Sequence, residues 1–224
     1  MPRSPRIAPG GFVFHVLNRA NGRAPIFEKP SDYQAFERVI VRTMECVAMR
    51  ILSYCLMPNH WHFVLWPYED GDLAAFMHRL TTTHVRRWHL YRHTVGTGHL
   101  YQGTFKSFPV QTDEHFITVC RYVERNPVRA GLAEHAEDWP WGSASAARRR
   151  RSANRPPIAD WPVRRPRDWL TMVNTPLTAA EIEACRLSAA RGRLLGGAKW
   201  QARVAQQLGL EFTLHARGRP RNIS

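Results

Sequence analysis

Two histidines separated by a single tryptophan, His60 and His62, lie inside the apolar stretch MPNHWHFVLWP at residues 57–67. The apolar neighbours favour a β-strand, in which side chains alternate between the two faces with a period of two residues. His60 and His62 would then share one face, while Trp61 packs on the other. Two imidazoles side by side on a strand can begin a metal site, but they leave most of the coordination sphere unfilled. Hydrogen-bonded core histidines that bind no metal are also compatible with this pattern.

A second candidate pair, Tyr122 and Asn126, stands further along the chain in the segment CRYVERNP. If this segment is helical, residues four apart lie on one face about one turn from each other. A phenol beside an amide oxygen offers a nucleophile next to a third metal ligand. The alternative is a half-buried aromatic residue and a polar helix end before Pro127, and the residues alone leave both readings open.

These side chains must be positioned by the elements around them. Apolar and β-branched runs predict strands at 12–18, 51–57, 62–66 and 105–111, and helical spacing of apolar residues predicts helices at 31–49, 73–91 and 113–126. Ser31 with Gln34 suggests a capping box for the first helix. The order β-α-β-β-α-β-α predicts an α+β sandwich, with helices over one face of an antiparallel sheet.

The last third of the chain differs in composition. Residues 148–169 are rich in arginine and proline and predict a basic linker, which either follows a phosphate backbone or is a solvated connector. Two helices are expected at 175–192 and 198–210, where Thr178 and Glu181 form a capping box. This pair either contacts DNA like a helix-turn-helix or packs on the core. The predicted division is 1–146, a catalytic domain, 147–174, the linker, and 175–224, a helical extension with a basic tail.

Charge and cysteine content limit the class of protein. The net charge is +14, with 16 Lys and Arg against 13 Asp and Glu in residues 1–147 and 16 against 5 in residues 148–224. An acidic polymer should therefore meet the C-terminal third most strongly. The four cysteines are scattered without a C-x-x-C pair, which favours a reducing compartment over a zinc ribbon or a disulfide scaffold. No apolar run is long enough for a membrane span, so a cytoplasmic protein is expected.

Five segments carry a resemblance to a known family: FHVLNR, MPNHWHFVLWP, GHLYQGTFKS, RYVERNPVRAGL and WPWGSAS. Their order and approximate spacing resemble those of REP-associated tyrosine transposases, a branch of the HUH single-strand DNA transposases. The resemblance covers roughly residues 11–146. His-x-His after Pro-Asn, followed by Y-x-x-x-N-P-V-x-A-G-L, is a strong joint signal, although each half alone is weak.

The resemblance implies a ferredoxin-like fold and metal-dependent cleavage of single-stranded DNA through a covalent 5′-phosphotyrosine. It assigns His60, His62 and Asn126 as metal ligands and Tyr122 as the nucleophile, and it implies association with the bacterial nucleoid when the protein binds DNA. Tyr101 is the runner-up, because its loop between two glycines could reach a substrate, although the family pattern places a general aromatic residue there and not the attacking group. Mn²⁺ or Mg²⁺ is favoured over structural zinc, because the ligand set has no thiolate and is incomplete. A single-stranded DNA hairpin is the expected partner. No membrane and no obligate protein partner are implied, and the protein would be a monomer or a homodimer.

Basic side chains give the candidate DNA contacts: Arg86, Arg87, Lys106, Arg148, Arg149, Arg150, Arg151, Arg217, Arg219 and Arg221. The segment RGRPR at 217–221 resembles the core of a minor-groove hook, and is equally compatible with an unstructured basic end. Two other functions remain open. One is a catalytically silent DNA-binding protein of repeat elements, and the other is a replication or conjugation nickase of the same superfamily.

Overall fold

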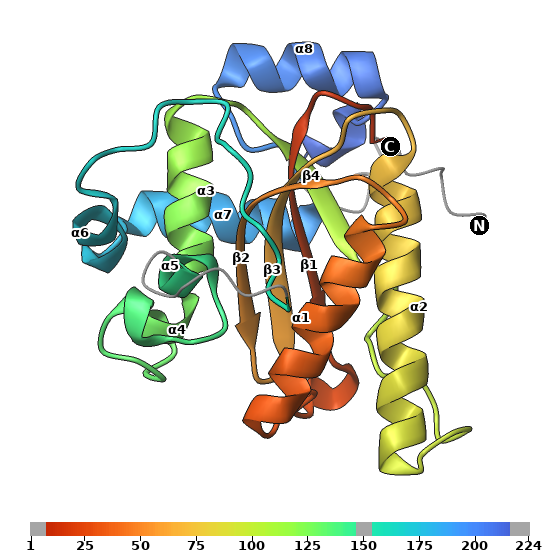
Figure 1. The fold of residues 1–224 in the computed structure, drawn as a ribbon. Helices are drawn as coiled ribbons and strands as arrows, with labels where there is room; N and C mark the ends of the chain where they lie inside the picture. The colour runs from red at the N-terminus through yellow and green to blue at the C-terminus, as the bar shows by residue number, and fades with distance from the viewer. Residues whose placement is uncertain (1–7, 147–153, 216–224) are drawn as a thin grey trace, which may run out of the picture.

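The computed structural model describes residues 8–146 and 154–215, and its centre is a four-stranded antiparallel sheet in the order β2-β3-β1-β4 (Figure 1). Each neighbouring pair of strands is antiparallel. The strands are β1 (Val13–Arg19), β2 (Arg50–Met57), β3 (His60–Trp66) and β4 (Lys106–Val110). With a helix between β1 and β2 and another between β3 and β4, the connectivity is ferredoxin-like. The predicted α+β class and antiparallel sheet are confirmed.

Two long helices, α1 (Pro30–Met44) and α2 (Asp72–Arg92), cover one face of the sheet (Figure 1). Alternate strand residues such as Phe14, Val16 and Phe63 meet the apolar stripes of both helices in one buried cluster. This face holds the larger core. The expected capping box of Ser31 and Gln34 is not present, because α1 begins at Pro30 and Lys29 is its N-cap. Asp32 is the third residue of the helix, and its carboxylate accepts hydrogen bonds from the backbone N–H groups of Glu28 and Lys29.

Helices also cover the opposite face, which corrects the expectation that they would lie on one face alone. There α3 (Glu114–Glu124), α4 (Asn126–Arg129) and α7 (Ala179–Arg191) lie against the sheet, and α6 (Trp169–Asn174) packs against α3 (Figure 1). Val13, Leu52 and Val64 point into this second buried cluster. The sequences of β2 and β3 are consistent with helices on both faces. Their interior residues are nearly all buried, and a strand that is buried on both faces does not alternate between apolar and polar residues.

The end of the chain closes one edge of the sheet. Leu195 forms a parallel bridge to Val110 of β4, with hydrogen bonds from Leu195 N to Pro109 O and from Gln111 N to Leu195 O. The last long helix, α8 (Ala198–Leu208), follows. Covering the outer strand protects backbone groups that would otherwise be open to pairing with another chain. The two expected C-terminal helices are therefore present, and Thr178 and Glu181 form the predicted capping box.

The stretch predicted as a linker packs on the sheet in its described part. Ala159 N donates to Ile51 O, and the indole of Trp161 donates to Leu52 O. The division at 146 and 174 stays a prediction, as does the role of Arg148 to Arg151, which lie outside the described residues. The shorter elements are η1 (Asn21–Arg23), η2 (Ala136–Asp138), α5 (Ser143–Ala146) and η3 (Glu211–Thr213). No helix in residues 8–146 or 154–215 has the length and apolar character needed to cross a membrane.

Candidate active site

Strand β3 places the two histidines on one face of the sheet, as the period of two predicts. The rings of His60 and His62 have centroids 5.2 Å apart, and both lie on the α3 side. Trp61, between them, is fully buried on the α1–α2 side. His60 is partly exposed at the start of β3, and His62 is buried. A shared ligand could therefore reach both imidazoles from the solvent end of the strand.

Each of these histidines is oriented by a hydrogen bond at Nδ1. Asn59, in the turn before β3, places its Oδ1 2.7 Å from His60 Nδ1, and the same amide donates to Arg23 O. His62 Nδ1 lies 2.9 Å from His15 Nε2. In the described part of the chain these are the ring hydrogen bonds of the two histidines, which leaves Nε2 of each available to a ligand.

His15 is a site residue that the sequence analysis did not single out. It is fully buried in β1, its ring stacks on His62 at a centroid distance of 5.1 Å, and Phe108 packs edge-on against it at 4.9 Å. Its Nδ1 has no hydrogen-bond partner among the described residues. The available signal was a histidine inside the apolar run FVFHVLN, since an ionisable residue in a buried strand usually has a specific partner.

Burial keeps this histidine cluster neutral. Loss of hydration lowers the pKa of His15 to about 3. The pKa of His60 falls to about 4, first through burial and then through the nearby charges of Arg19 and Arg129. Burial and the neighbouring His15 and His60 hold the pKa of His62 well below its usual value. Neutral imidazoles keep a nitrogen lone pair, which a metal ion requires.

Helix α3 brings Tyr122 over the same cluster. The Tyr122 ring centroid lies 6.0 Å from that of His62 and 6.1 Å from that of His15, in edge-to-face geometry. The guanidinium of Arg129 stands 4.4 Å from the centre of the Tyr122 ring. Arg129 was not predicted either, although it lies in the same RYVERNPVRAGL motif. The Arg129 guanidinium therefore makes a cation–π contact with the Tyr122 ring.

Asn126 is the first residue of α4, directly after the break between α3 and α4. The sequence predicted one continuous helix at 113–126 and did not predict this break. Its amide Nδ2 donates to Tyr122 O at 3.0 Å, and its Oδ1 accepts from Arg129 Nη2 at 2.7 Å. An amide oxygen has two lone pairs, so one remains for a second partner. Asn126, Tyr122 and Arg129 thus form one linked group around the helix break.

This donor set fits a divalent metal ion. His60 and His62 offer neutral imidazole nitrogens, Asn126 offers an amide oxygen, and Nδ1 of both histidines is already fixed by a neighbour. Imidazole nitrogens and amide oxygens are both ligands of divalent metal ions in proteins. Asp113, Glu114 and His115 also lie close enough together to hold an ion. There, however, Asp113 caps α3 and binds His115 through Nδ1, so the group has a structural explanation.

The alternative tyrosine lies on the other side of the sheet. Tyr101 is buried, accepts a hydrogen bond from Trp61 Nε1 at 2.9 Å, and has its hydroxyl 2.6 Å from His84 Nδ1. Because Trp61 and His62 point to opposite faces of β3, the Tyr101 hydroxyl is separated from the histidine pair by the sheet.

The predicted DNA-contacting cations occupy different surfaces. Arg86 and Arg87 are exposed on α2, but Arg86 lines a cavity beside residues 95–105 while Arg87 lines a groove against α1. Lys106 is exposed at the start of β4, and its Nζ donates to Ala189 O. Arg217, Arg219 and Arg221 lie outside the described residues.

Comparisons with known proteins bear on the family and on the fold of this chain. Residues 11–126 match the family model described as "Transposase IS200 like". The chain is 22% identical over 134 residues to a REP-associated tyrosine transposase of Escherichia coli K12, covering 60% of this chain and 76% of that protein. It is 24% identical over 122 residues to a putative REP-associated tyrosine transposase of Haemophilus influenzae, covering 50% and 69%.

A solved structure of a REP-associated tyrosine transposase bound to a REP hairpin shares the fold. Its TM-score is 0.54 at 20% identity, covering 72% of this chain and 96% of that one.

Proposed function

This chain belongs to the family of IS200-like transposases, and from that premise we propose that it cleaves and rejoins single-stranded DNA at hairpin repeats, with Tyr122 as the nucleophile. The observation that carries the proposal is the convergence of Tyr122 on the histidine pair. A phenol ring 6.0 Å from His62, with Asn126 hydrogen-bonded to the same helical turn, joins two motifs that are remote in sequence.

In the proposed reaction the Tyr122 oxygen attacks the phosphorus atom of one phosphodiester. A bond forms between the phenol oxygen and phosphorus, and the bond from phosphorus to the 3′-oxygen breaks. The phenol loses its proton, and the departing 3′-oxygen gains one. The product is a 5′-phosphate esterified to Tyr122 and a free 3′-OH. Attack by a 3′-OH on this ester reverses the step and joins strands without an outside energy source.

The chain's own residues prepare this attack. Arg129 over the Tyr122 ring offsets the negative charge that develops on the phenol. His15 and Asn59 fix the rings of His62 and His60, and Asn126 ties its amide to the backbone of Tyr122. His60, His62 and Asn126 would hold the metal ion. A bound divalent ion supplies neutralisation of charge on the non-bridging phosphate oxygens.

The substrate class follows from charge and from the relative. The net charge of +14 favours a polyanion. The related protein of known structure was solved with a REP hairpin. We therefore place a DNA hairpin with an adjoining single strand as the substrate of this chain.

The test uses labelled single-stranded hairpins from the repeats of the host genome, incubated with the full chain with and without Mn²⁺ and separated on denaturing gels. Metal-dependent cleavage, together with joining of the product to a second oligonucleotide, is the expected result. Tight hairpin binding with no cleavage under any metal would instead identify a catalytically silent DNA-binding protein. Cleavage that persists after removal of all divalent metal would contradict the assigned ligands.

A further inference from the structure

The C-terminal extension packs against the helix that carries Tyr122. Helices α6 and α7 both contact α3 and lie beside it (Figure 1). Both follow residue 126, the last residue that the family model matches. These contacts therefore join the proposed nucleophile to a part of the chain that the family pattern does not describe.

Arg121, the residue directly before Tyr122, binds both helices of the extension. Its Nε donates to Met172 O in α6 at 3.0 Å, and its Nη2 donates to Thr175 O, just after that helix, at 3.2 Å. Its Nη1 forms an ion pair with Glu181 of α7 at 3.1 Å. Because only 13% of the Arg121 side chain is exposed, this is a packed contact and not a solvated surface ion pair.

Arg125, one helical turn further along the chain, binds the same end of α6. Its Nη1 donates to Val173 O at 3.1 Å and also to Asn174 O. The last carbonyl groups of a helix have no partner within the helix, and cationic side chains are favourable there. Because α6 has only six residues, it depends on tertiary contacts of this kind for its stability.

Glu124 makes a third connection, from the buried side of α3. Its Oε2 accepts a hydrogen bond from Trp169 Nε1, at the start of α6, at 2.7 Å. Its Oε1 accepts from the hydroxyl groups of Ser53 at 3.1 Å and Ser143 at 2.5 Å. Ser53 belongs to β2, so one buried carboxylate links the extension, α3 and the sheet.

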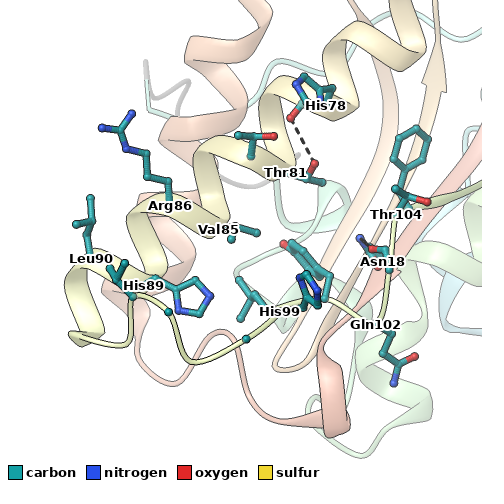
Figure 2. Close-up of a pocket in the computed structure, with 18 residues that line it drawn as sticks. Asn18, His78, Thr81, Val85, Arg86, His89, Leu90, His99, Gln102 and Thr104 are labelled. Atoms are coloured by element: carbon teal, nitrogen blue, oxygen red, sulfur yellow. Dashed lines mark hydrogen bonds between the residues drawn. The ribbon is translucent and has the colours of Figure 1, made fainter.

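Helix α2, on the other face of the sheet, is held differently. A cavity lies between its second half and residues 95–105, and Figure 2 shows Val85 and His89 on one side of this cavity and His99 on the other. Helix α3 instead has α6 beside it, joined by side-chain hydrogen bonds on consecutive turns. The proposed nucleophile therefore comes from the helix that the extension holds.

The position of the Tyr122 oxygen depends on the position of α3. The Tyr122 ring meets His62 and His15 edge-on, and ring pairs of this kind tolerate a range of centroid distances. A displacement of an attacking atom by about 1 Å can lower a rate about 100-fold. The ring contacts alone are therefore too permissive to place the phenol oxygen, and the helix has to be fixed from its other sides.

We infer that Arg121, Glu124 and Arg125 are positioning residues, which use the C-terminal extension to hold α3 so that the Tyr122 oxygen stands where it can attack. The inference rests on the proposed function, because it assigns these residues a role in the same reaction. The extension then contributes to the rate of bond formation and not to the affinity for DNA.

The first experiment separates rate from affinity in the full chain. Arg121→Ala should lower the single-turnover rate of hairpin cleavage at saturating DNA and Mn²⁺ by about 10–100-fold, because the phenol is no longer held in place. Hairpin affinity, measured by fluorescence anisotropy without metal, should change by less than about twofold. Arg121→Lys keeps the ion pair with Glu181 and should have an intermediate rate. The matched control is Arg186→Ala, which removes the same charge from an exposed position of α7 and should change neither quantity.

An unchanged cleavage rate in Arg121→Ala would overturn the inference. Equal losses of rate and hairpin affinity would also overturn it, because Arg121 would then bind DNA or serve only the fold.

The second experiment observes the nucleophile without any DNA or metal. Fluorine NMR is recorded on the full chain with 3-fluorotyrosine at position 122. Arg121→Ala should shift the resonance or add a second one, and Arg186→Ala should leave it unchanged. Trp169→Phe keeps a buried ring but removes the donor to Glu124, so it should change the resonance even if Arg121→Ala does not fold.

A resonance of Tyr122 that is the same in wild type, Arg121→Ala and Trp169→Phe would overturn the inference. This spectrum does not depend on cleavage. A wild-type protein that cleaves no hairpin would therefore count against the proposed function alone, and the two ideas fail separately.

Discussion

Strand β3 separates two buried clusters of histidine and tyrosine that differ in how their polar atoms are satisfied. On the α1–α2 side, Trp61 Nε1 donates to the Tyr101 hydroxyl, which also forms a hydrogen bond with His84 Nδ1. The indole is a donor only, so the Tyr101 oxygen accepts from it, and the tautomer of His84 sets the direction of the second bond. His84 and Tyr101 also pack against Phe36 and Trp61, and the whole group lies in the larger core.

On the α3 side, the same kinds of residue leave nitrogen atoms open. His15 Nδ1 has no partner among the described residues, and His62 is held through one ring nitrogen. A closed network, in which the polar atoms are hydrogen-bonded to one another, fixes the strand. An open network, in which some nitrogen atoms have no partner, keeps ligand positions available at a cost in stability. The comparison teaches that alternate residues of one strand can take different roles: Trp61 packs in the core, and His62 lies in the proposed active site on the other face.

The largest expected effect comes from breaking the open cluster. His62→Ala should reduce metal-dependent cleavage by more than about a hundredfold and abolish tight Mn²⁺ binding, because a ligand is lost. Its melting temperature should change little, since the site is not a closed network. Cleavage gels, Mn²⁺ titration and thermal unfolding measure the three quantities. Cleavage at the wild-type rate would contradict the assignment of His62.

Breaking the closed cluster should give the opposite result. Trp61→Ala removes a fully buried indole and the donor to Tyr101, so the free energy of unfolding should fall by about 3–5 kcal/mol. The protein that remains folded at low temperature should still bind Mn²⁺. Denaturant unfolding checks the loss, with Trp66→Ala at the partly exposed end of β3 as the control. Similar losses in both variants would show that the closed cluster is not special.

A smaller effect tests the residue that orients His62. His15→Phe keeps a buried ring but removes the partner of His62 Nδ1, so Mn²⁺ affinity should fall about 10–100-fold. The matched control is His84→Phe, a buried histidine on the other face, which should leave Mn²⁺ affinity unchanged. Isothermal titration gives both values. Equal affinities in wild type and His15→Phe would mean that His15 is only a packing residue.

The smallest effect concerns acid stability. Burial lowers the pKa of His84 to about 3, whereas in the unfolded chain it is about 6.5. Between these values the unfolded state binds more protons, so stability falls as pH decreases, with His84 contributing about 1.4 kcal/mol per pH unit. His84→Phe should remove that contribution. Unfolding curves at pH 7 and 5.5 measure it, and an unchanged pH dependence in the variant would contradict a neutral, buried His84.

Local pattern predicted much of the fold. The strand alternation around His60 and His62, the four strands and the main helices followed from periodicity and apolar runs. The placement of helices on both faces did not, because apolar runs in β2 and β3 indicate burial without saying what covers them. The packing of Trp161 and Trp169 beside α3 was hidden by the arginine-rich and proline-rich composition around them.

The sequence predicted the motif residues of the candidate site but not the residues that support them. Two motifs predicted these residues: His60 with His62, and Tyr122 with Asn126. Only the family resemblance connected the two motifs to each other. His15 and Arg129 act through contacts across β1 and around the helix break, and no local spacing encodes such contacts. Long-range pairing in the sheet brings His15 to His62, since β1 lies next to β3.

The most direct test of the account is the identity of the covalently modified residue. Wild-type protein is incubated with a cleavable hairpin and Mn²⁺, digested, and analysed by mass spectrometry, with Tyr122→Phe and Tyr101→Phe in parallel. The account predicts a 5′-phosphodeoxynucleotide on the Tyr122 peptide. It also predicts the same adduct in Tyr101→Phe protein that remains folded, and hairpin binding without any adduct in Tyr122→Phe. An adduct on Tyr101, or an adduct that persists in Tyr122→Phe, would contradict the assignment of the nucleophile.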